Sequence, residues 1–313
     1  MKAVRLNEFG DVDVLKIEEV QEPNLRPHHV MIKVDSAGVN YADILRRGGN
    51  YPGPSLPSSM GLESAGTVTE VGSDVTGIIV GQQVMAMGPG SQAEYVAVNG
   101  NLVFPYPNSL DAVEAGGMPI VFLTAYHILK SRGHMQSGDT VLVQAGASGV
   151  GTVLIQLAKA WGAKVIATTS SPEKATKATE LGADVVINYK EEDIRERVRE
   201  ITGGAGVDCV VDHVGADFFV PAFASLRTGG RYGICGATTG LRTELHLGLL
   251  FSQQKEIYGV YMGTKEDMRE IVELMNRGAI KPVVDRTFPL AEVAAAHKYM
   301  GETSFFGKLI LTQ

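Results

Sequence analysis

The feature of this chain that most constrains its fold is a glycine-rich segment between an apolar run and an amphipathic helix. The apolar run, Thr140–Gln144, has the length of a strand and leads into Ala145-Gly146-Ala147-Ser148-Gly149-Val150-Gly151. Apolar side chains then recur at every third or fourth position from Val150 to Trp161, which predicts a helix with one buried face. Because a strand that turns into a helix through small residues opens a βαβ unit, we expect a parallel sheet around Thr140–Gln144.

The alternation of strands and helices continues to about residue 262. Apolar runs of strand length, most of them separated by helical patterns, occur at Thr140–Gln144, Lys164–Thr169, Asp184–Asn188, Val207–Asp212, Arg231–Cys235 and Ile257–Met262. This order is typical of a doubly wound α/β fold. We therefore predict a Rossmann-type domain with a parallel sheet over residues 119–262.

The rest of the chain predicts a second, β-rich domain. Short strands such as Val30–Val34 and Gly66–Gly72 are bounded by Gly, Pro, Asn and Ser, with one short helix near Tyr41–Arg47. After residue 262 we expect a helix, a strand, a second helix and a last strand, Phe306–Thr312, that returns to the first domain. This catalytic domain would comprise residues 1–118 and 263–313.

Composition limits the classes of function. A length of 313 residues suits about two domains. A net charge of −7 without a Lys/Arg-rich block argues against nucleic acid or a membrane surface as partner. The chain lacks a long apolar span and a signal-peptide pattern at its start, so we expect a cytoplasmic protein that acts on a small molecule.

The glycine-rich turn predicts a dinucleotide site. Small residues let backbone N–H groups approach a pyrophosphate, and the N-terminus of the following helix adds partial positive charge. Read as G-x-G-x-x-G, the turn keeps Gly146 and Gly151 but has Ser148 in the middle. The predicted contacts are Gly146, Ala147, Ser148, Gly149, Val150 and Gly151. The alternative is a tight turn without a ligand.

The end of the second strand indicates which nicotinamide cofactor binds. An NAD site normally places an acidic residue there for the ribose 2′-OH, whereas this chain has Ser170 and Ser171, with Lys174 shortly after. Hydroxyls and a lysine suit the 2′-phosphate of NADP(H). Alternatively, Ser171 only caps a helix that begins at Pro172, and both roles are compatible.

With these features the chain resembles the medium-chain dehydrogenase/reductase superfamily over essentially its whole length. It is most similar to the zinc-independent quinone oxidoreductase branch, of the zeta-crystallin type. The segments that carry the resemblance are Ala37–Asp43, Gly48–Pro52, Leu123–Tyr126, Ala145–Gly151, Ile187–Tyr189, Ile201–Gly204, Val211–Gly215 and Phe306–Leu311. The resemblance implies a GroES-like fold for the β-rich domain.

The resemblance also implies that zinc is absent. Zinc alcohol dehydrogenases of this superfamily bind the catalytic metal with Cys, the His of a Gly-His-Glu triplet and a second Cys. The corresponding residues here are Ser36, Leu62 and Ile120, and leucine and isoleucine have no lone pair for a metal. Glu63, retained from the triplet, is expected to bind an arginine or a backbone amide. The chain's two cysteines, Cys209 and Cys235, fall in expected strands and suit buried small apolar residues.

The positions that match the family's motifs suggest the catalytic residues. Tyr51 would donate a proton or hydrogen bond, and Asn40 would hold the nicotinamide ribose or the substrate oxygen, both in a cleft between the domains. For Tyr51 the alternative is packing against a proline-rich loop. Seven histidines, among them His213 after the fourth strand, fit hydrogen-bonded structural roles better than catalysis.

Four further residues are expected at the cofactor. Thr124 belongs to a segment that carries the resemblance, and Tyr189 would lie near the adenosine phosphate. Gly236 would keep the backbone near the nicotinamide free of a side chain. Lys308 completes the set.

These features predict a zinc-independent, NADPH-dependent reductase of quinones or other α,β-unsaturated carbonyl compounds. One alternative is an enoyl-thioester reductase, with Arg46, Arg47 and Arg132 as candidates for a basic rim. Another is a non-catalytic NADPH-binding protein. The apolar strand Glu256–Met262 at the edge of the expected sheet predicts a homodimer, or a tetramer built from it.

Overall fold

A computed structural model describes residues 1–313 and divides the chain into two compact units. The first unit comprises Met1–Ile120 and Pro282–Gln313, and the second comprises Val121–Lys281. Residues 263–281, which the sequence pattern assigned to the catalytic domain, thus group with the Rossmann-type sheet. Long-range hydrogen bonds join this segment to the second unit: the Asp267 carboxylate accepts from the Ser131 hydroxyl at 2.6 Å, and the Lys281 amide donates to Gln156 Oε1 at 3.0 Å.

The second unit contains a six-stranded parallel sheet in the order β11-β10-β9-β12-β13-β14. Its strands are β9 (Thr140–Val143), β10 (Lys164–Thr169), β11 (Val185–Asn188), β12 (Val207–Asp212), β13 (Leu226–Ile234) and β14 (Glu256–Gly259). The chain runs outward from β9 to β11 and then crosses back to β12 on the other side of β9. This order is the doubly wound arrangement that the sequence pattern predicted.

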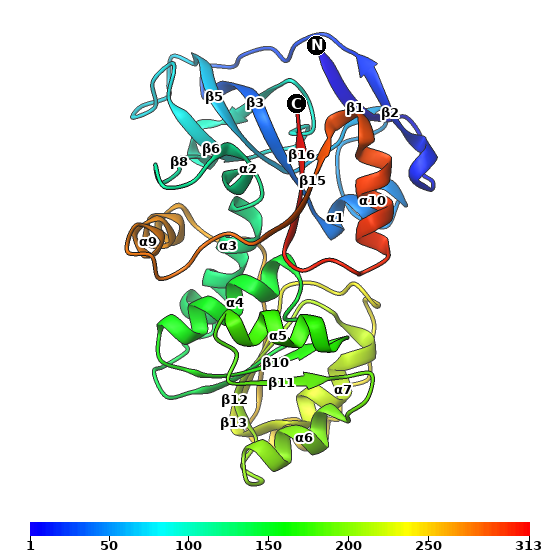
Figure 1. The fold of residues 1–313 in the computed structure, drawn as a ribbon, viewed down its shortest axis with the longest axis vertical. Coiled ribbons are helices and arrows are strands. Elements are labelled where there is room, and N and C mark those ends of the chain that lie inside the picture. Colours follow the sequence, from blue (N-terminus) through cyan, green and yellow to red (C-terminus); the bar gives the residue numbers. More distant parts are fainter. The chain divides into compact units, whose positions relative to one another are not determined.

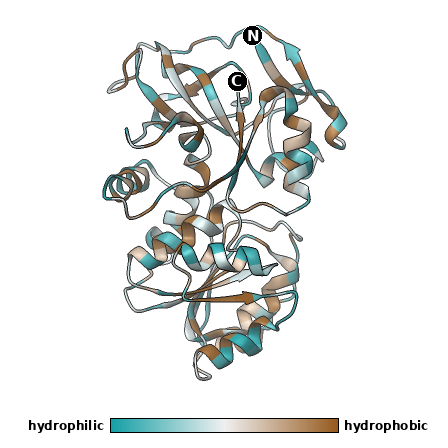
Figure 2. Ribbon diagram, viewed as in Figure 1, coloured by the Kyte–Doolittle hydropathy of each residue, from teal (hydrophilic) through white to brown (hydrophobic).

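Helices cover both faces of this sheet. The helices of the second unit are α3 (Pro119–Tyr126), which begins at the boundary of the units, α4 (Gly149–Ala160), α5 (Pro172–Glu180), α6 (Ile194–Ile201), α7 (Ala216–Ala224), α8 (Leu247–Ser252) and α9 (Lys265–Asn276), with a π-helical turn, η3 (His127–Ser131). Helices α4 and α5 lie on one side of the sheet, and α6 and α7 lie on the other (Figure 1). The core on the α6 and α7 side contains Leu142, Val210, Phe219 and Tyr232. The strands are accordingly among the most apolar segments of this unit (Figure 2).

Local chemistry sets the ends of the first two helices of this sheet. Ser148 caps α4 by accepting a hydrogen bond from the Gly151 amide, and Ser171 caps α5 by accepting from the Lys174 amide. Both helices are followed by a glycine in the left-handed region, Gly162 at φ 82° and Gly182 at φ 113°.

The first unit is β-rich, as predicted. A three-stranded sheet has the order β2-β1-β4, and a seven-stranded sheet has the order β15-β16-β3-β5-β6-β8 with β7 paired to β3. The strands are β1 (Lys2–Leu6), β2 (Leu15–Glu19), β3 (His29–Val39), β4 (Ser58–Ser59), β5 (Glu63–Val71), β6 (Gln83–Met87), β7 (Tyr95–Asn99), β8 (Val103–Pro105), β15 (Val284–Pro289) and β16 (Lys308–Thr312). Strand β16 pairs antiparallel with β3, so the chain's last strand belongs to this unit.

Short helices complete the first unit. They are α1 (Tyr41–Arg47), α2 (Ala112–Ala115) and α10 (Val293–Gly301), with single turns at η1 (Val12–Val14), η2 (Gly100–Leu102) and η4 (Leu290–Glu292). Helix α10 packs through Val293, Ala296 and Met300 into a core with Leu309 and Leu311 of β16. None of the helices in the chain is both long and apolar enough to cross a membrane.

Candidate active site

The glycine-rich turn lies at the carboxyl end of β9, where the strand order reverses between β9 and β12. Ligands of doubly wound sheets bind at this switch point. Ala145 takes the left-handed φ of 45°. At Gly151 a Cβ atom would lie 2.3 Å from the Ala145 carbonyl oxygen, so only glycine lets α4 begin this close to the strand.

The start of α4 presents backbone donors. The Ser148 hydroxyl accepts from the Gly151 amide at 2.9 Å, and the Ser148 carbonyl accepts from the Thr152 amide at 2.9 Å. The first amides of the helix, those of Gly149 and Val150, have no intrahelical acceptor. This cradle of small residues with two open N–H groups fits the pyrophosphate of a dinucleotide.

Ser148, in the place of the middle glycine of the fingerprint, links two parts of this edge. Its hydroxyl lies 2.7 Å from Nε2 of His213, which follows β12. Burial lowers the pKa of His213, so the ring is neutral at physiological pH. Its Nδ1 is buried and has no hydrogen-bond partner. His213 therefore has a structural role, as expected: it bonds to Ser148 across the switch point. No spacing in the sequence indicates that these two residues pair.

The end of β12 is held by a buried carboxylate. Asp212 accepts hydrogen bonds from the amides of Val214 and Gly215, at 2.7 and 3.1 Å, and from the Tyr232 hydroxyl at 2.7 Å. Burial and the Asp212 charge raise the pKa of Tyr232, so the phenol stays protonated. A Cβ on Gly236 would lie 3.0 Å from the His213 carbonyl oxygen, so Gly236 passes close to this loop, at the same edge as the turn.

Ser170 and Ser171 follow β10 at this edge. The Ser171 hydroxyl accepts from the Lys174 amide at 3.4 Å and caps α5, with Pro172 in its first turn. A hydrogen bond to Ser171 also lowers the pKa of the exposed Glu173. The capping role weighed from the sequence is thus present, while contact with a 2′-phosphate remains a prediction.

Tyr189 and Thr124 occupy different surroundings within the second unit. The Tyr189 amide donates to the Thr169 carbonyl at 3.1 Å, which places Tyr189 beside the end of β10. Its ring packs edge-on against Phe218, with centroids 4.9 Å apart. Thr124 is buried within α3.

In the first unit, Asn40, Glu63 and Lys308 form one buried network. The Lys308 ammonium donates to Asn40 Oδ1 and Glu63 Oε1, each at 2.8 Å, and to the Val39 carbonyl at 3.0 Å. Asn40 Nδ2 donates to Glu63 Oε1 at 2.9 Å. Because lysine only donates and a carboxylate only accepts, the two flanking charges fix the orientation of the Asn40 amide. All three ammonium hydrogens are used inside the unit, so the expected contact of Lys308 with the cofactor remains a prediction.

The other oxygen of Glu63 accepts from the Ile120 amide at 2.8 Å. The expectation of a backbone amide as partner is met, and the cationic partner is a lysine rather than an arginine. Lys308 and Glu63 lie 245 residues apart in the chain, and the sequence contains no signal that pairs them.

Asp43 in α1 lies next to this network. Its carboxylate accepts from the Asn40 amide at 2.9 Å. Burial raises its pKa to about 7, although the backbone hydrogen bond and Lys308 oppose the shift. Asp43 is therefore a buried group that can exchange a proton near neutral pH, a property that sequence analysis missed.

Tyr51 lines a small cavity of about 30 Å³ together with Asp43, Arg46 and Leu62. That volume holds about two water molecules. The Arg46 guanidinium is fixed against the Pro54 carbonyl and over the Phe9 ring. Tyr51 and Asp43 thus line the same small pocket.

The positions that hold zinc in related dehydrogenases do not fit the metal. The Ser36 hydroxyl donates to the Ala112 carbonyl, and Leu62 and Ile120 offer no side-chain donor atom. No group of three His, Cys, Asp or Glu residues with metal-binding geometry occurs in the chain. Burial raises the pKa of Cys209 to about 11 and that of Cys235 to about 12, which keeps both as thiols.

The second unit is a doubly wound sheet with a glycine-rich switch point, and the first is a β-rich unit with a buried polar network. Together these features define a dinucleotide-dependent oxidoreductase of the medium-chain type. Residues 26–108 match the alcohol dehydrogenase GroES-like domain, and residues 149–277 match the family described as zinc-binding dehydrogenase. The quinone oxidoreductase of Pseudomonas aeruginosa is 33% identical, with 99% of each chain covered. The 2-haloacrylate reductase of a Burkholderia species is 33% identical, with 99% of this chain and 98% of the relative covered.

A solved structure agrees over the whole length. The Escherichia coli quinone oxidoreductase complexed with NADPH has a TM-score of 0.94 at 30% identity, with 100% of each chain covered. The chain belongs to the quinone oxidoreductase branch of the medium-chain dehydrogenase/reductase superfamily. The predicted fold class, with its Rossmann-type sheet and GroES-like domain, is confirmed.

Proposed function

We propose that this chain is a zinc-independent, NADPH-dependent reductase of quinones or other α,β-unsaturated carbonyl compounds. Its full-length similarity to a quinone oxidoreductase and a 2-haloacrylate reductase is the observation that carries the proposal. The dinucleotide turn and the residues that replace the zinc ligands support it. One relative's name refers to quinones and the other's to an acrylate, and both are acceptors with a polarised double bond.

The residues present fit NADPH, which when bound supplies hydride to the acceptor. The Gly149 and Val150 amides at the start of α4 would hold its pyrophosphate, and Ser170, Ser171 and Lys174 would hold the 2′-phosphate. Gly146 and Gly151 keep the turn free of side chains, and Gly236 does the same beyond β13. These assignments account for NADP(H) as the cofactor.

Without a metal, charge that develops on the acceptor oxygen is stabilised by hydrogen-bond donors. Asn40 is suited to this role, because Lys308 and Glu63 fix its amide and leave one Nδ2 hydrogen for a ligand. Lys308 and Glu63 are then positioning residues. Tyr51 is the proposed donor of a proton or hydrogen bond, and Asp43, which lines the same pocket, is the proposed group that resupplies the proton.

The test is a steady-state assay with NADPH and a panel of quinones and enones. We expect turnover with at least one acceptor, and a tenfold or larger loss of kcat in Tyr51→Phe. Tyr106→Phe, at a half-buried tyrosine bonded to Gln83 in the first unit, is the control that keeps its activity. Tight NADPH binding without oxidation by any acceptor would instead indicate a non-catalytic NADPH-binding protein.

An enoyl-thioester reductase is less well supported. Of its candidate arginines, Arg46 is bonded to the Pro54 carbonyl and Arg47 to the Gly10 carbonyl and Asp11. Both guanidinia thus use part of their donors within the first unit, while Arg132, after η3, is exposed. Competition between an acyl-CoA substrate and a quinone in the same assay separates the two activities.

We also propose a cytoplasmic homodimer. Strand β14 lies at the edge of the six-stranded sheet and has an open row of backbone donors and acceptors. Apolar side chains near it are exposed, including Ile257, Phe251 and Tyr261. A dimer, or a tetramer of such dimers, would cover them.

A further inference from the structure

The second unit contains a pocket of about 660 Å³ at the edge of the sheet opposite the glycine-rich turn. Gly206, directly before β12, and Ser225, directly before β13, form part of its lining. These residues precede the amino ends of parallel strands, whereas a dinucleotide binds at the carboxyl ends. The volume is in the range of small-molecule sites. Any ligand here is therefore distinct from the dinucleotide.

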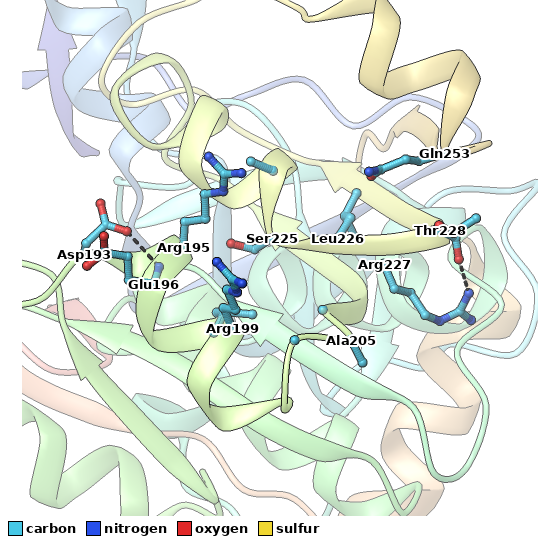
Figure 3. Close-up of a pocket in the computed structure, with 14 residues that line it drawn as sticks. Asp193, Arg195, Glu196, Arg199, Ala205, Ser225, Leu226, Arg227, Thr228 and Gln253 are labelled. Carbon is cyan, nitrogen blue, oxygen red and sulfur yellow. Dashed lines mark hydrogen bonds between the residues drawn. The ribbon is translucent and has the colours of Figure 1, made fainter.

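Three arginines from two elements line this pocket. Arg195 and Arg199 come from α6, four residues apart and hence on one face of the helix, and Arg227 comes from β13. In Figure 3 the α6 arginines lie between Asp193 and Glu196 on one side and Arg227 on the other. Two acids and three arginines line the pocket, and Asp208, just outside the lining, pairs with Arg227.

The arginines of α6 differ in their partners. Arg197 forms ion pairs with both Glu192 and Glu200. The side chains of Arg195 and Arg199 form no ion pair or hydrogen bond in the structure, although two like charges at this spacing repel. An anion between them would remove that repulsion.

Arg227 lies on the opposite wall, and its guanidinium is turned away from the α6 arginines toward Thr228 (Figure 3). Its Nε donates to Asp208 at 2.5 Å, and its Nη1 donates to the Thr228 carbonyl at 2.5 Å. A guanidinium has five N–H donors, so three remain. The turn before β12 adds no bulk, since a Cβ on Gly203 or Gly204 would meet nothing within 4 Å.

We propose that this pocket binds a small organic phosphate. The planar forks of Arg195 and Arg199, whose side chains have no partner in the structure, match phosphate oxygens. Asp193 and Glu196 form the acidic end of the pocket, where they would accept hydrogen bonds from hydroxyl groups of the ligand. The ligand class is thus a phosphate ester that also carries hydroxyls, as sugar phosphates do.

The experiment is calorimetric titration of ribose 5-phosphate into the full-length protein saturated with NADP⁺, so that the dinucleotide site is occupied. We expect saturable binding, and a Kd about tenfold higher in Arg199→Gln and in Arg195→Gln, the value of one charge-assisted hydrogen bond. Arg197→Gln, on the same helix but outside the pocket lining, should stay within about twofold of the unchanged protein.

Absence of saturable binding overturns the proposal. So does an equal loss in Arg197→Gln, because the effect would then come from the overall charge of α6. Thermal unfolding of each variant verifies that it is folded. The titration needs no turnover, so it is decided separately from the reductase activity. If NADP⁺ does not bind, ribose 5-phosphate is titrated into the protein without NADP⁺, and the same three variants are compared.

Discussion

At the scale of single residues, buried charge is the feature that most shapes the proposed active site. Lys308 and Glu63 are almost fully buried, and each uses its hydrogen-bonding capacity on the other, on Asn40 or on the backbone. Asn40 and Lys308 could be proposed from family motifs, because each lies in a recognisable local segment. Their partnership could not, because it depends on β16 returning to pair with β3 across the length of the chain.

Replacing Lys308 by methionine should be strongly destabilising. The substitution leaves the Glu63 carboxylate buried without a cation, which costs about 3–5 kcal/mol of unfolding free energy. Urea unfolding measures this, with the exposed Lys298→Met as control. The double variant Lys308→Met, Glu63→Gln removes the orphaned charge and should recover part of the loss. A loss no larger in Lys308→Met than in the control would contradict the network.

Asp43 should give the folding stability a pH dependence. Its pKa is about 7 in the fold against 3.8 for the free group. Between these values the folded state binds more protons than the unfolded state, so this group's contribution to stability falls as pH rises from about 4 to 7. Above pH 7 it is constant. Asp43→Asn, which keeps an oxygen for the Asn40 amide, should lack this slope in urea unfolding measured across the range. An unchanged slope would show that Asp43 does not carry the shift.

Lys174 should distinguish the two nicotinamide cofactors. If it contacts the 2′-phosphate, Lys174→Ala removes a charge-assisted hydrogen bond worth about 1–3 kcal/mol from NADPH and nothing from NADH. Fluorescence titration with each cofactor measures the two Kd values, and Lys177→Ala on the same helix is the control. Equal weakening of both cofactors would refute the contact.

At the scale of elements, most helices and strands follow from local patterns. The boundaries of α1 and the strand β12 coincide with the predicted ranges, because apolar periodicity, caps and glycines act within a few residues. The turn between β9 and α4 was recognisable for the same reason. What the pattern did not reveal is the second use of Ser148, its bond to His213, because the two residues belong to different βα units.

Ser148 should contribute to α4 mainly as its cap. Ser148→Ala removes the acceptor for the Gly151 amide and a partner of His213, and should lower the unfolding free energy by about 1 kcal/mol. Ser148→Gly restores the usual fingerprint residue, and it should lower the unfolding free energy by only about a few tenths of a kcal/mol. Urea unfolding of both variants compares them. If both lose the same stability, the cap is not the origin of the effect.

At the scale of the whole molecule, sequence patterns identified the two units but not where the second one ends. Helix α9 reads as an ordinary amphipathic helix, and its sequence does not say which core it joins. Asp267 of α9 accepts from Ser131 and lies 2.8 Å from His127 Nδ1. These contacts, distant in the chain, join α9 to the second unit. Assembly is a property of the same kind, since it depends on which edge stays open after folding.

The open edge at β14 leads to the last prediction. A lysine in place of Ile257, which is 36% exposed, would set a charge against its copy across a β14–β14 junction and prevent the strands from pairing. Sedimentation equilibrium should find the unchanged protein dimeric and Ile257→Lys monomeric at the same concentration. Val220→Lys, at a residue that is 55% exposed on α7 rather than on β14, should remain dimeric. A monomer at every concentration of the unchanged protein would disprove the dimer, and a dimeric Ile257→Lys would place the interface elsewhere.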